Sequence, residues 1–122
     1  MTHERSQFFA DWQVGRIVVR ELASAPAKTL AFVVMPDHWH WLLELNTVAL
    51  SALVQRVKSR SAVTVNRALY RQGQLWQSGF HDRALRYDED VLGIARYVIA
   101  NPLRAGLVKK VGDYPLWDAA WL

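Results

Sequence analysis

Residues 29–45 read TLAFVVMPDHWHWLLEL and decide the expected fold, because they hold two strand-like runs in succession. The first run, Thr29–Met35, is rich in Leu, Phe and Val, which favours a strand. The second, His38–Leu45, alternates its side chains well enough to form another strand. The stretch therefore predicts two neighbouring strands of a small sheet.

The segments around this stretch predict helices packed on that sheet. Apolar spacing predicts a helix before the strands and a long one after them, and Asp88 is a good N-cap residue for a last helix. A further short strand is expected between the last two helices. The expected elements are helix Phe8–Leu22, strands Thr29–Met35 and His38–Leu45, helix Leu50–Arg71, a strand within Leu75–Leu85, and helix Asp88–Ala100. No repeat or linker interrupts residues 1–122, so the sequence predicts one α+β domain with a small antiparallel sheet.

Composition narrows the class of protein. The chain has 122 residues, 52% hydrophobic and 21% charged, as an ordinary globular domain does. Because cysteine is absent, disulfides, thiolate metal sites and a cysteine nucleophile are excluded. The longest apolar stretches run to about six residues, too short for a membrane-spanning helix. Residues Met1–Gln7 are polar and unlike a signal peptide, so we expect a cytoplasmic protein with no membrane partner.

Positive charge is concentrated in one segment. The chain carries 15 Lys and Arg against 11 Asp and Glu, a net charge of +4. No acidic residue lies between Glu44 and Asp82, whereas five basic residues do: Arg56, Lys58, Arg60, Arg67 and Arg71. Such a segment suits a phosphate backbone or an anionic membrane surface, and it equally suits a solvated cationic helix face.

Two histidines lie two residues apart on the second expected strand. Alternate side chains of a strand share a face, so His38 and His40 point to one side and Trp39 and Trp41 to the other. Two neighbouring imidazoles can hold one metal ion through two nitrogens. A pair of histidines hydrogen-bonded at a sheet edge is the alternative, and on this motif alone it is the more frequent arrangement.

The last expected helix presents a polar pair away from its apolar stripe. At helical spacing its apolar residues cluster on one face: Val91, Leu92, Ala95, Val98 and Ile99. Tyr97 points almost directly away from that stripe, and Asn101 follows one turn later on the same side. A surface tyrosine without a function would give the same pattern. Tyr97 and Asn101 therefore indicate a functional site only if other candidate residues lie beside them.

Several motifs together resemble a known family. The segment Met35-Pro36-Asp37-His38-Trp39-His40 is similar to the histidine motif of the single-tyrosine HUH transposases of bacteria, and residues 97–108 (YVIANPLRAGLV) resemble their tyrosine segment. Residues 75–82 (LWQSGFHD) and 114–117 (YPLW) resemble, more narrowly, the REP-associated tyrosine transposases. The resemblance extends from about Leu30 to the C-terminus.

The resemblance implies a fold and a chemistry. It implies a ferredoxin-like HUH endonuclease fold in which His38, His40 and Asn101 hold a divalent cation, Mg²⁺ or Mn²⁺. Tyr97 would attack a phosphodiester of single-stranded or hairpin DNA and give a 5′-phosphotyrosine link with a free 3′-hydroxyl.

Supporting roles follow on the same basis. Arg56, Lys58, Arg60 and Arg67 would contact the DNA backbone. Arg83, Arg86 and Arg104 would contact phosphate or remain solvated. Three aromatic residues, Trp76, Phe80 and Tyr87, would stack on unpaired bases or, for the first two, lie in the core.

The sequence departs from the family pattern at two places. Family members usually have an aromatic-rich strand before the first helix, and no such run precedes Phe8 here, so we expect a free sheet edge that a second copy of the chain could pair with. Pro102 also disfavours helical torsions at Asn101. We therefore expect a metal-dependent transposase that could form a homodimer. The alternatives are a DNA-binding module of this fold that does not cut and an unrelated two-histidine metal enzyme.

Overall fold

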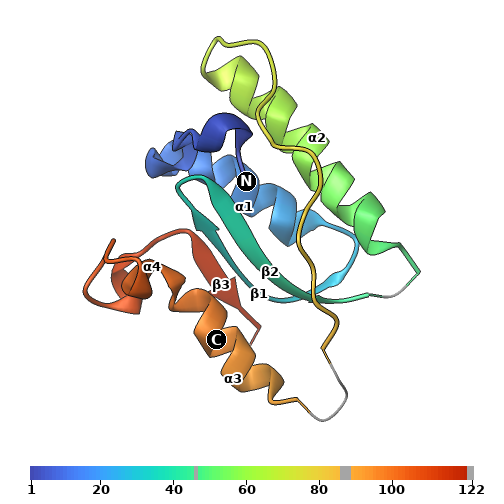
Figure 1. Cartoon of the computed structure of the whole chain (residues 1–122), viewed down its shortest axis with the longest axis vertical. Coiled ribbons are helices and arrows are strands. Elements are labelled where there is room, and N and C mark those ends of the chain that lie inside the picture. The colour runs from blue at the N-terminus through green and yellow to red at the C-terminus, as the bar shows by residue number, and fades with distance from the viewer. Residues whose placement is uncertain (46, 86–88, 121–122) are drawn as a thin grey trace.

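The computed structural model describes residues 1–45, 47–85 and 89–120, and shows helices on both faces of a small sheet (Figure 1). The helices are α1 (Trp12–Ser24), α2 (Leu50–Ala68), α3 (Val91–Ile99) and α4 (Asn101–Arg104), and the strands are β1 (Lys28–Met35), β2 (His38–Glu44) and β3 (Trp117–Ala119). Short 3-10 helices span His3–Arg5, Phe8–Ala10 and Val111–Asp113. The predicted α+β class with an antiparallel sheet is confirmed.

The sheet is antiparallel, with the strand order β2-β1-β3. The central strand is β1, whose residues 31–35 are all buried, as expected for a strand covered on both faces. His40 pairs with Val33 and His38 with Met35 in the β1–β2 register. The histidine strand β2 therefore lies at an edge of the sheet, which agrees with the expected free edge. Among the described residues, β2 has a partner only in β1.

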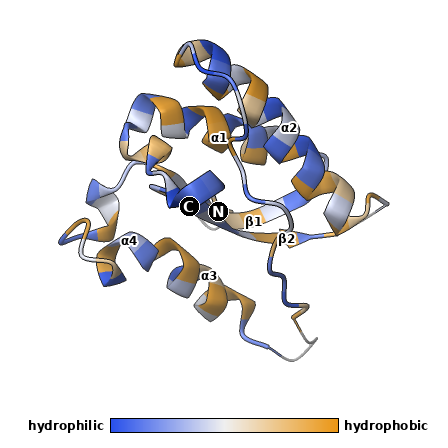
Figure 2. Ribbon diagram, turned by 45° about the horizontal axis from the view of Figure 1, so that its top comes forward, coloured by the Kyte–Doolittle hydropathy of each residue, from blue (hydrophilic) through white to orange (hydrophobic). Residues whose placement is uncertain are grey.

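The two faces of the sheet carry different helices (Figure 2). On one face lie α1 and α2, and on the other lie α3 and α4. The core forms mainly beneath α1, where Val18 and Leu22 are fully buried. Asp11 caps α1 by accepting a hydrogen bond from the Gln13 amide at 3.0 Å. Across the described part of the chain, no helix combines the length and the apolar character needed to cross a membrane.

The third strand was predicted in the wrong place. Within residues 75–85 the structure has only an isolated bridge between Trp76 and Thr2, and no strand. The strand that completes the sheet is β3, near the C-terminus. It is three residues long, too short to show the period-two pattern that sequence analysis uses.

The three predicted helices are present, with limits that differ from the predicted ones by up to four residues. The predicted first helix splits at Asp11 into the 3-10 helix at Phe8–Ala10 and α1. The last helix is capped by Asp90, whose carboxylate accepts from the Gly93 amide at 2.9 Å. The predicted cap, Asp88, lies outside the described residues.

Candidate functional site

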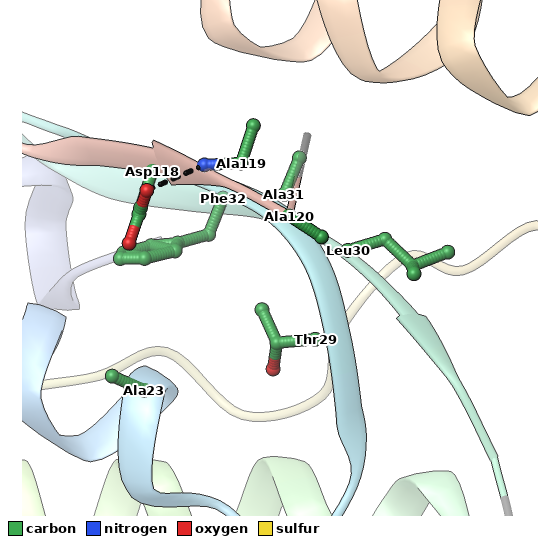
Figure 3. Close-up of a pocket in the computed structure, with 8 residues that line it drawn as sticks. All are labelled: Ala23, Thr29, Leu30, Ala31, Phe32, Asp118, Ala119 and Ala120. Atoms are coloured by element: carbon green, nitrogen blue, oxygen red, sulfur yellow. Dashed lines mark hydrogen bonds between the residues drawn. The ribbon is translucent and has the colours of Figure 1, made fainter. Parts of the chain in front are cut away.

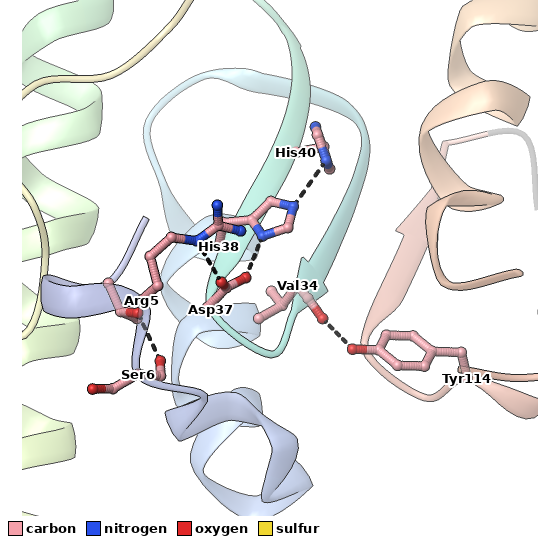
Figure 4. Close-up of polar contacts among 8 residues, drawn as sticks. Arg5, Ser6, Val34, Asp37, His38, His40 and Tyr114 are labelled. Carbon is pink, nitrogen blue, oxygen red and sulfur yellow. Dashed lines mark hydrogen bonds and ion pairs between the residues drawn. The ribbon is translucent and has the colours of Figure 1, made fainter. Parts of the chain in front are cut away.

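The two histidines of β2 lie side by side on one face of the sheet, as the strand alternation predicts (Figure 4). Their Nε2 atoms are 3.2 Å apart and their ring centroids 4.9 Å apart. Trp39, between them in sequence, points to the opposite face, where its ring lies 4.8 Å from that of Trp76. Trp76 in turn donates its indole N–H to Ser61 of α2. The histidine face is therefore the one that α3 and α4 cover.

Asp37, in the turn that joins β1 to β2, fixes the ring of His38. Its Oδ1 lies 2.6 Å from Nδ1 of His38, and its Oδ2 accepts from Nε of Arg5 at 3.0 Å. A carboxylate only accepts, so Nδ1 of His38 carries the proton and its Nε2 faces His40. Burial of Asp37 acts to raise its pKa, but the hydrogen bonds from His38 and Arg5 outweigh burial and lower the pKa below its usual value.

His40 is held in its neutral form. Burial, followed by the nearby His38 and the charge of Arg104, lowers the pKa of His40 to about 4. At neutral pH one of its two ring nitrogens is therefore unprotonated, as a metal ion requires.

The histidine pair fits a divalent cation. Two nitrogens bound at roughly 2.1 Å and at right angles to one another are about 3.0 Å apart, close to the separation of the two Nε2 atoms. Imidazole nitrogens favour a transition metal ion, so Mn²⁺ suits this pair better than Mg²⁺ does. Among the residues that the structure describes, no third His, Cys, Asp or Glu completes a cluster with the pair.

Asn101 is the remaining predicted ligand. It was expected one turn beyond Tyr97 on the same helix, but α3 ends at Ile99 and Asn101 begins the separate helix α4, ahead of Pro102. Asn101 takes part in this helix despite the proline that follows it. Its amide nitrogen donates to the Val98 carbonyl at 2.8 Å, so its Oδ1 is the atom suited to bind a cation.

Tyr97 is presented on α3 with 65% of its surface exposed, as the helix phase predicts. The guanidinium of Arg104 lies 3.6 Å from the centre of its ring and donates to its backbone carbonyl at 2.6 Å. Arg104 also lowers the pKa of His40, so its charge acts on both halves of the candidate site. The structure thus brings Tyr97, Arg104 and the histidine pair to the same face of the sheet.

The basic residues of α2 divide into two groups. Arg56, Arg60 and Arg67 are exposed and recur at helical spacing on one side of the helix. Arg60 pairs with Glu21 of α1 at 2.8 Å. Lys58 is on another side, where its ammonium donates to the carbonyls of Gln77 and Gly79 at 2.9 and 2.5 Å. Burial lowers the pKa of Lys58.

The other predicted DNA contacts differ in their surroundings. Arg83 is paired with Glu89, and Arg86 and Tyr87 lie outside the described residues. Trp76 is buried, as the core interpretation predicts, whereas Phe80 is 43% exposed.

Two hollows stand out on the surface that the described residues form. One, of about 190 Å³, lies where β1 meets β3 and is lined mainly by small and apolar side chains with Asp118 (Figure 3). The other, of about 440 Å³, is bounded by residues 38–40 of β2, by Lys58 and by residues 76–81. Only the second adjoins the histidine pair.

Two residues of the site escaped sequence analysis as functional candidates, Arg5 and Asp37. Asp37 is adjacent to His38, and a carboxylate beside a candidate metal ligand is itself a signal. Arg5 is 32 positions away from Asp37 in sequence and carries no comparable signal.

Comparisons with known proteins show which proteins the chain resembles. The family model described as "Transposase IS200 like" matches residues 1–101. A Haemophilus influenzae protein assigned to the REP-associated tyrosine transposases is 30% identical over 101 residues, covering 74% of this chain and 57% of that protein. The REP-associated tyrosine transposase of Escherichia coli is 26% identical over 100 residues, covering 80% and 58%. The chain therefore spans less than three fifths of the length of these relatives.

A solved structure is similar over almost the whole chain. The structure of a REP-associated tyrosine transposase bound to a REP hairpin superposes with a TM-score of 0.69 at 27% identity. The match covers 94% of this chain and 69% of that protein.

Proposed function

The chain belongs to the family of IS200-like transposases, and on that premise we propose that it cleaves and rejoins one strand of DNA through Tyr97. The observation that carries the proposal is the placement of Tyr97, Arg104 and the histidine pair on one face of the sheet. This face offers a nucleophile, the guanidinium of Arg104 and two neighbouring imidazoles within one small region.

The residues divide the chemistry between them. The Tyr97 oxygen forms a bond to phosphorus as the bond from phosphorus to the 3′ oxygen breaks; the phenol loses its proton and the departing oxygen gains one. The products are a 5′-phosphotyrosine and a 3′-hydroxyl, and the reverse attack rejoins the strand without a cofactor that supplies energy. His38 Nε2, His40 Nε2 and Asn101 Oδ1 would hold a divalent cation. When bound, that cation would neutralise charge on the phosphate oxygens.

The DNA partner is proposed from the relative and from the charges. A related transposase is bound to a REP hairpin in its solved structure, and we propose hairpin or single-stranded DNA as the partner here. Arg56, Arg60 and Arg67 would follow the backbone along the outer side of α2. Arg104, already beside Tyr97, would contact the phosphate that is cut.

The decisive experiment is Tyr97→Phe. A labelled hairpin oligonucleotide with Mn²⁺ should form a covalent adduct with the parent protein that survives denaturation. Tyr97→Phe should retain DNA binding and form no adduct, because only the nucleophilic oxygen is removed. Tyr70→Phe is the matched control, since Tyr70 is 98% exposed and lies beyond the end of α2.

Two outcomes contradict the proposal in different ways. Continued cleavage at the same phosphodiester by Tyr97→Phe would assign the attack to water or to another residue. A parent protein that binds the hairpin and never forms an adduct would be the non-cleaving DNA-binding module.

A further inference from the structure

An unusual backbone conformation lies next to the candidate cation site. Glu4 and Arg5 have φ angles of 56° and 55°, in the left-handed region that non-glycine residues rarely adopt. Two such residues in succession persist only where the surrounding structure holds them. Here the contacts made by residues 2–9 hold the conformation of Glu4 and Arg5.

Hydrogen bonds on either side of Arg5 tie this segment to the turn before His38. The Thr2 amide donates to the Asp37 carbonyl at 2.8 Å, and the Phe9 amide donates to the Pro36 carbonyl at 2.9 Å. Thr2 is fully buried, and its hydroxyl donates to the Ser6 carbonyl at 2.6 Å, which closes the loop around Arg5. The Arg5 side chain is thereby directed at the Asp37 carboxylate.

The contacts of that carboxylate form a continuous chain (Figure 4). Arg5 Nε donates to Oδ2 of Asp37 at 3.0 Å, Oδ1 accepts from Nδ1 of His38 at 2.6 Å, and Nε2 of His38 lies 3.2 Å from Nε2 of His40. The Asp37 side chain is only 11% exposed, so water has little access to compete for its oxygens. Each oxygen of the carboxylate has its own partner.

We propose that Arg5 is a positioning residue, which acts through Asp37 to hold the His38 ring with Nε2 directed at the cation site. The inference rests on the proposed function, since the cation is part of that function. Without Arg5, Oδ2 would lose its donor and the carboxylate would be free to turn about its Cβ–Cγ bond. The His38 ring would then lose its fixed orientation.

The sign of the effect separates positioning from simple charge. Arg5 is a cation near a site for another cation, so charge alone predicts that its removal strengthens metal binding. Positioning predicts that its removal weakens binding, as loss of the groups that orient a ligand usually does.

The experiment measures Mn²⁺ binding by electron paramagnetic resonance of the free ion, without DNA. Arg5→Met should bind Mn²⁺ about tenfold more weakly than the parent, at the lower end of the range for lost orienting partners. Arg20→Met is the matched control: Arg20 is an exposed arginine of α1, and its replacement should leave the affinity unchanged. Equal or tighter binding by Arg5→Met would overturn the proposal.

A double-mutant comparison tests the route through Asp37. On an Asp37→Asn background the ion pair is already lost, so adding Arg5→Met should weaken binding no further. An undiminished tenfold loss on that background would overturn the route. Arg5→Lys should recover part of the affinity, because it restores a donor to the carboxylate.

A spectroscopic measurement gives a readout that needs no metal. Long-range ¹H–¹⁵N correlation should show the His38 ring protonated at Nδ1 in the parent, and a mixture of both neutral forms in Arg5→Met. A parent ring protonated at Nε2 alone would overturn the proposal. Neither the Mn²⁺ measurement nor the NMR measurement depends on strand cleavage. If Tyr97 formed no adduct with DNA, the proposed function would fail while these two results would still test the role of Arg5.

Discussion

Replacing Lys58 by methionine should loosen the segment of residues 75–81 while leaving the rest of the fold intact. Lys58 of α2 holds the part of this segment beyond Trp76, through its hydrogen bonds to the Gln77 and Gly79 carbonyls. Methionine keeps much of the length of the side chain and removes the donor. The segment would then keep the bond from the Trp76 indole to Ser61 and its backbone bonds, among them the Gln77 amide to the Met1 carbonyl at 2.8 Å. It would lose only the two hydrogen bonds from Lys58.

The size of the effect follows from the surroundings of the two bonds. Hydrogen bonds to charged groups contribute about 1.5–3 kcal/mol each when buried. Here the bond to Gln77 is partly buried and the bond to Gly79 is exposed, where water replaces most of the lost interaction. We therefore expect a combined loss of about 2 kcal/mol in the free energy of local opening. This corresponds to roughly thirtyfold faster hydrogen exchange at the Gln77 amide.

The assay is amide hydrogen exchange followed by NMR, on the parent, Lys58→Met and Arg56→Met. Arg56 is the matched control, because it is an exposed cation two residues away on the same helix. Protection at Gln77 should fall only in Lys58→Met, whereas amides of β1 should be unchanged in both variants. Protection at Gln77 that stays within twofold of the parent would show that Lys58 does not hold the segment.

Three further measurements test other contacts. Tyr114 donates its hydroxyl to the Val34 carbonyl at 2.5 Å and burial raises its pKa to about 12, so Tyr114→Phe should lower the free energy of unfolding by about 1–3 kcal/mol in urea titrations. Because the pKa of His40 is lowered to about 4 in the folded protein, folding favours its neutral form. Stability should therefore be full above pH 6.5 and fall by about 2–3 kcal/mol as the pH drops to about 4, a loss that thermal melts of His40→Gln should lack. Alanine at both Arg56 and Arg67 should reduce the salt slope of hairpin binding by about one per lost phosphate contact; an unchanged slope would place both side chains in solvent.

The sequence predicts those parts of the site that depend on the regular spacing of side chains along one strand or one helix. Alternation along a strand requires only neighbouring residues, so the pairing of His38 with His40 follows directly from their spacing. The exposure of Tyr97 follows in the same way from the turn of a helix. Both features are local, and both are confirmed.

The parts that sequence analysis misses depend on contacts between distant residues. Nothing within residues 28–44 shows whether β2 is central or at the edge, because that depends on which segment pairs with β1. The pairing of Arg5 with Asp37 and the direction of Lys58 likewise depend on how separate elements meet. Pairing of the free β2 edge with a second copy of the chain stays a prediction that light scattering can test.

The position of β3 affects the order in which parts of the protein fold. Its partner β1 ends at Met35, and the Tyr114 hydroxyl reaches Val34 across 80 positions of sequence. Such distant contacts close late, because the loop between them must be ordered first. During synthesis the hairpin of β1 and β2 emerges well before α3 and β3. The histidine pair is therefore in place before α3 has been synthesised, and Tyr97 joins it only when α3 docks on the sheet that β3 completes.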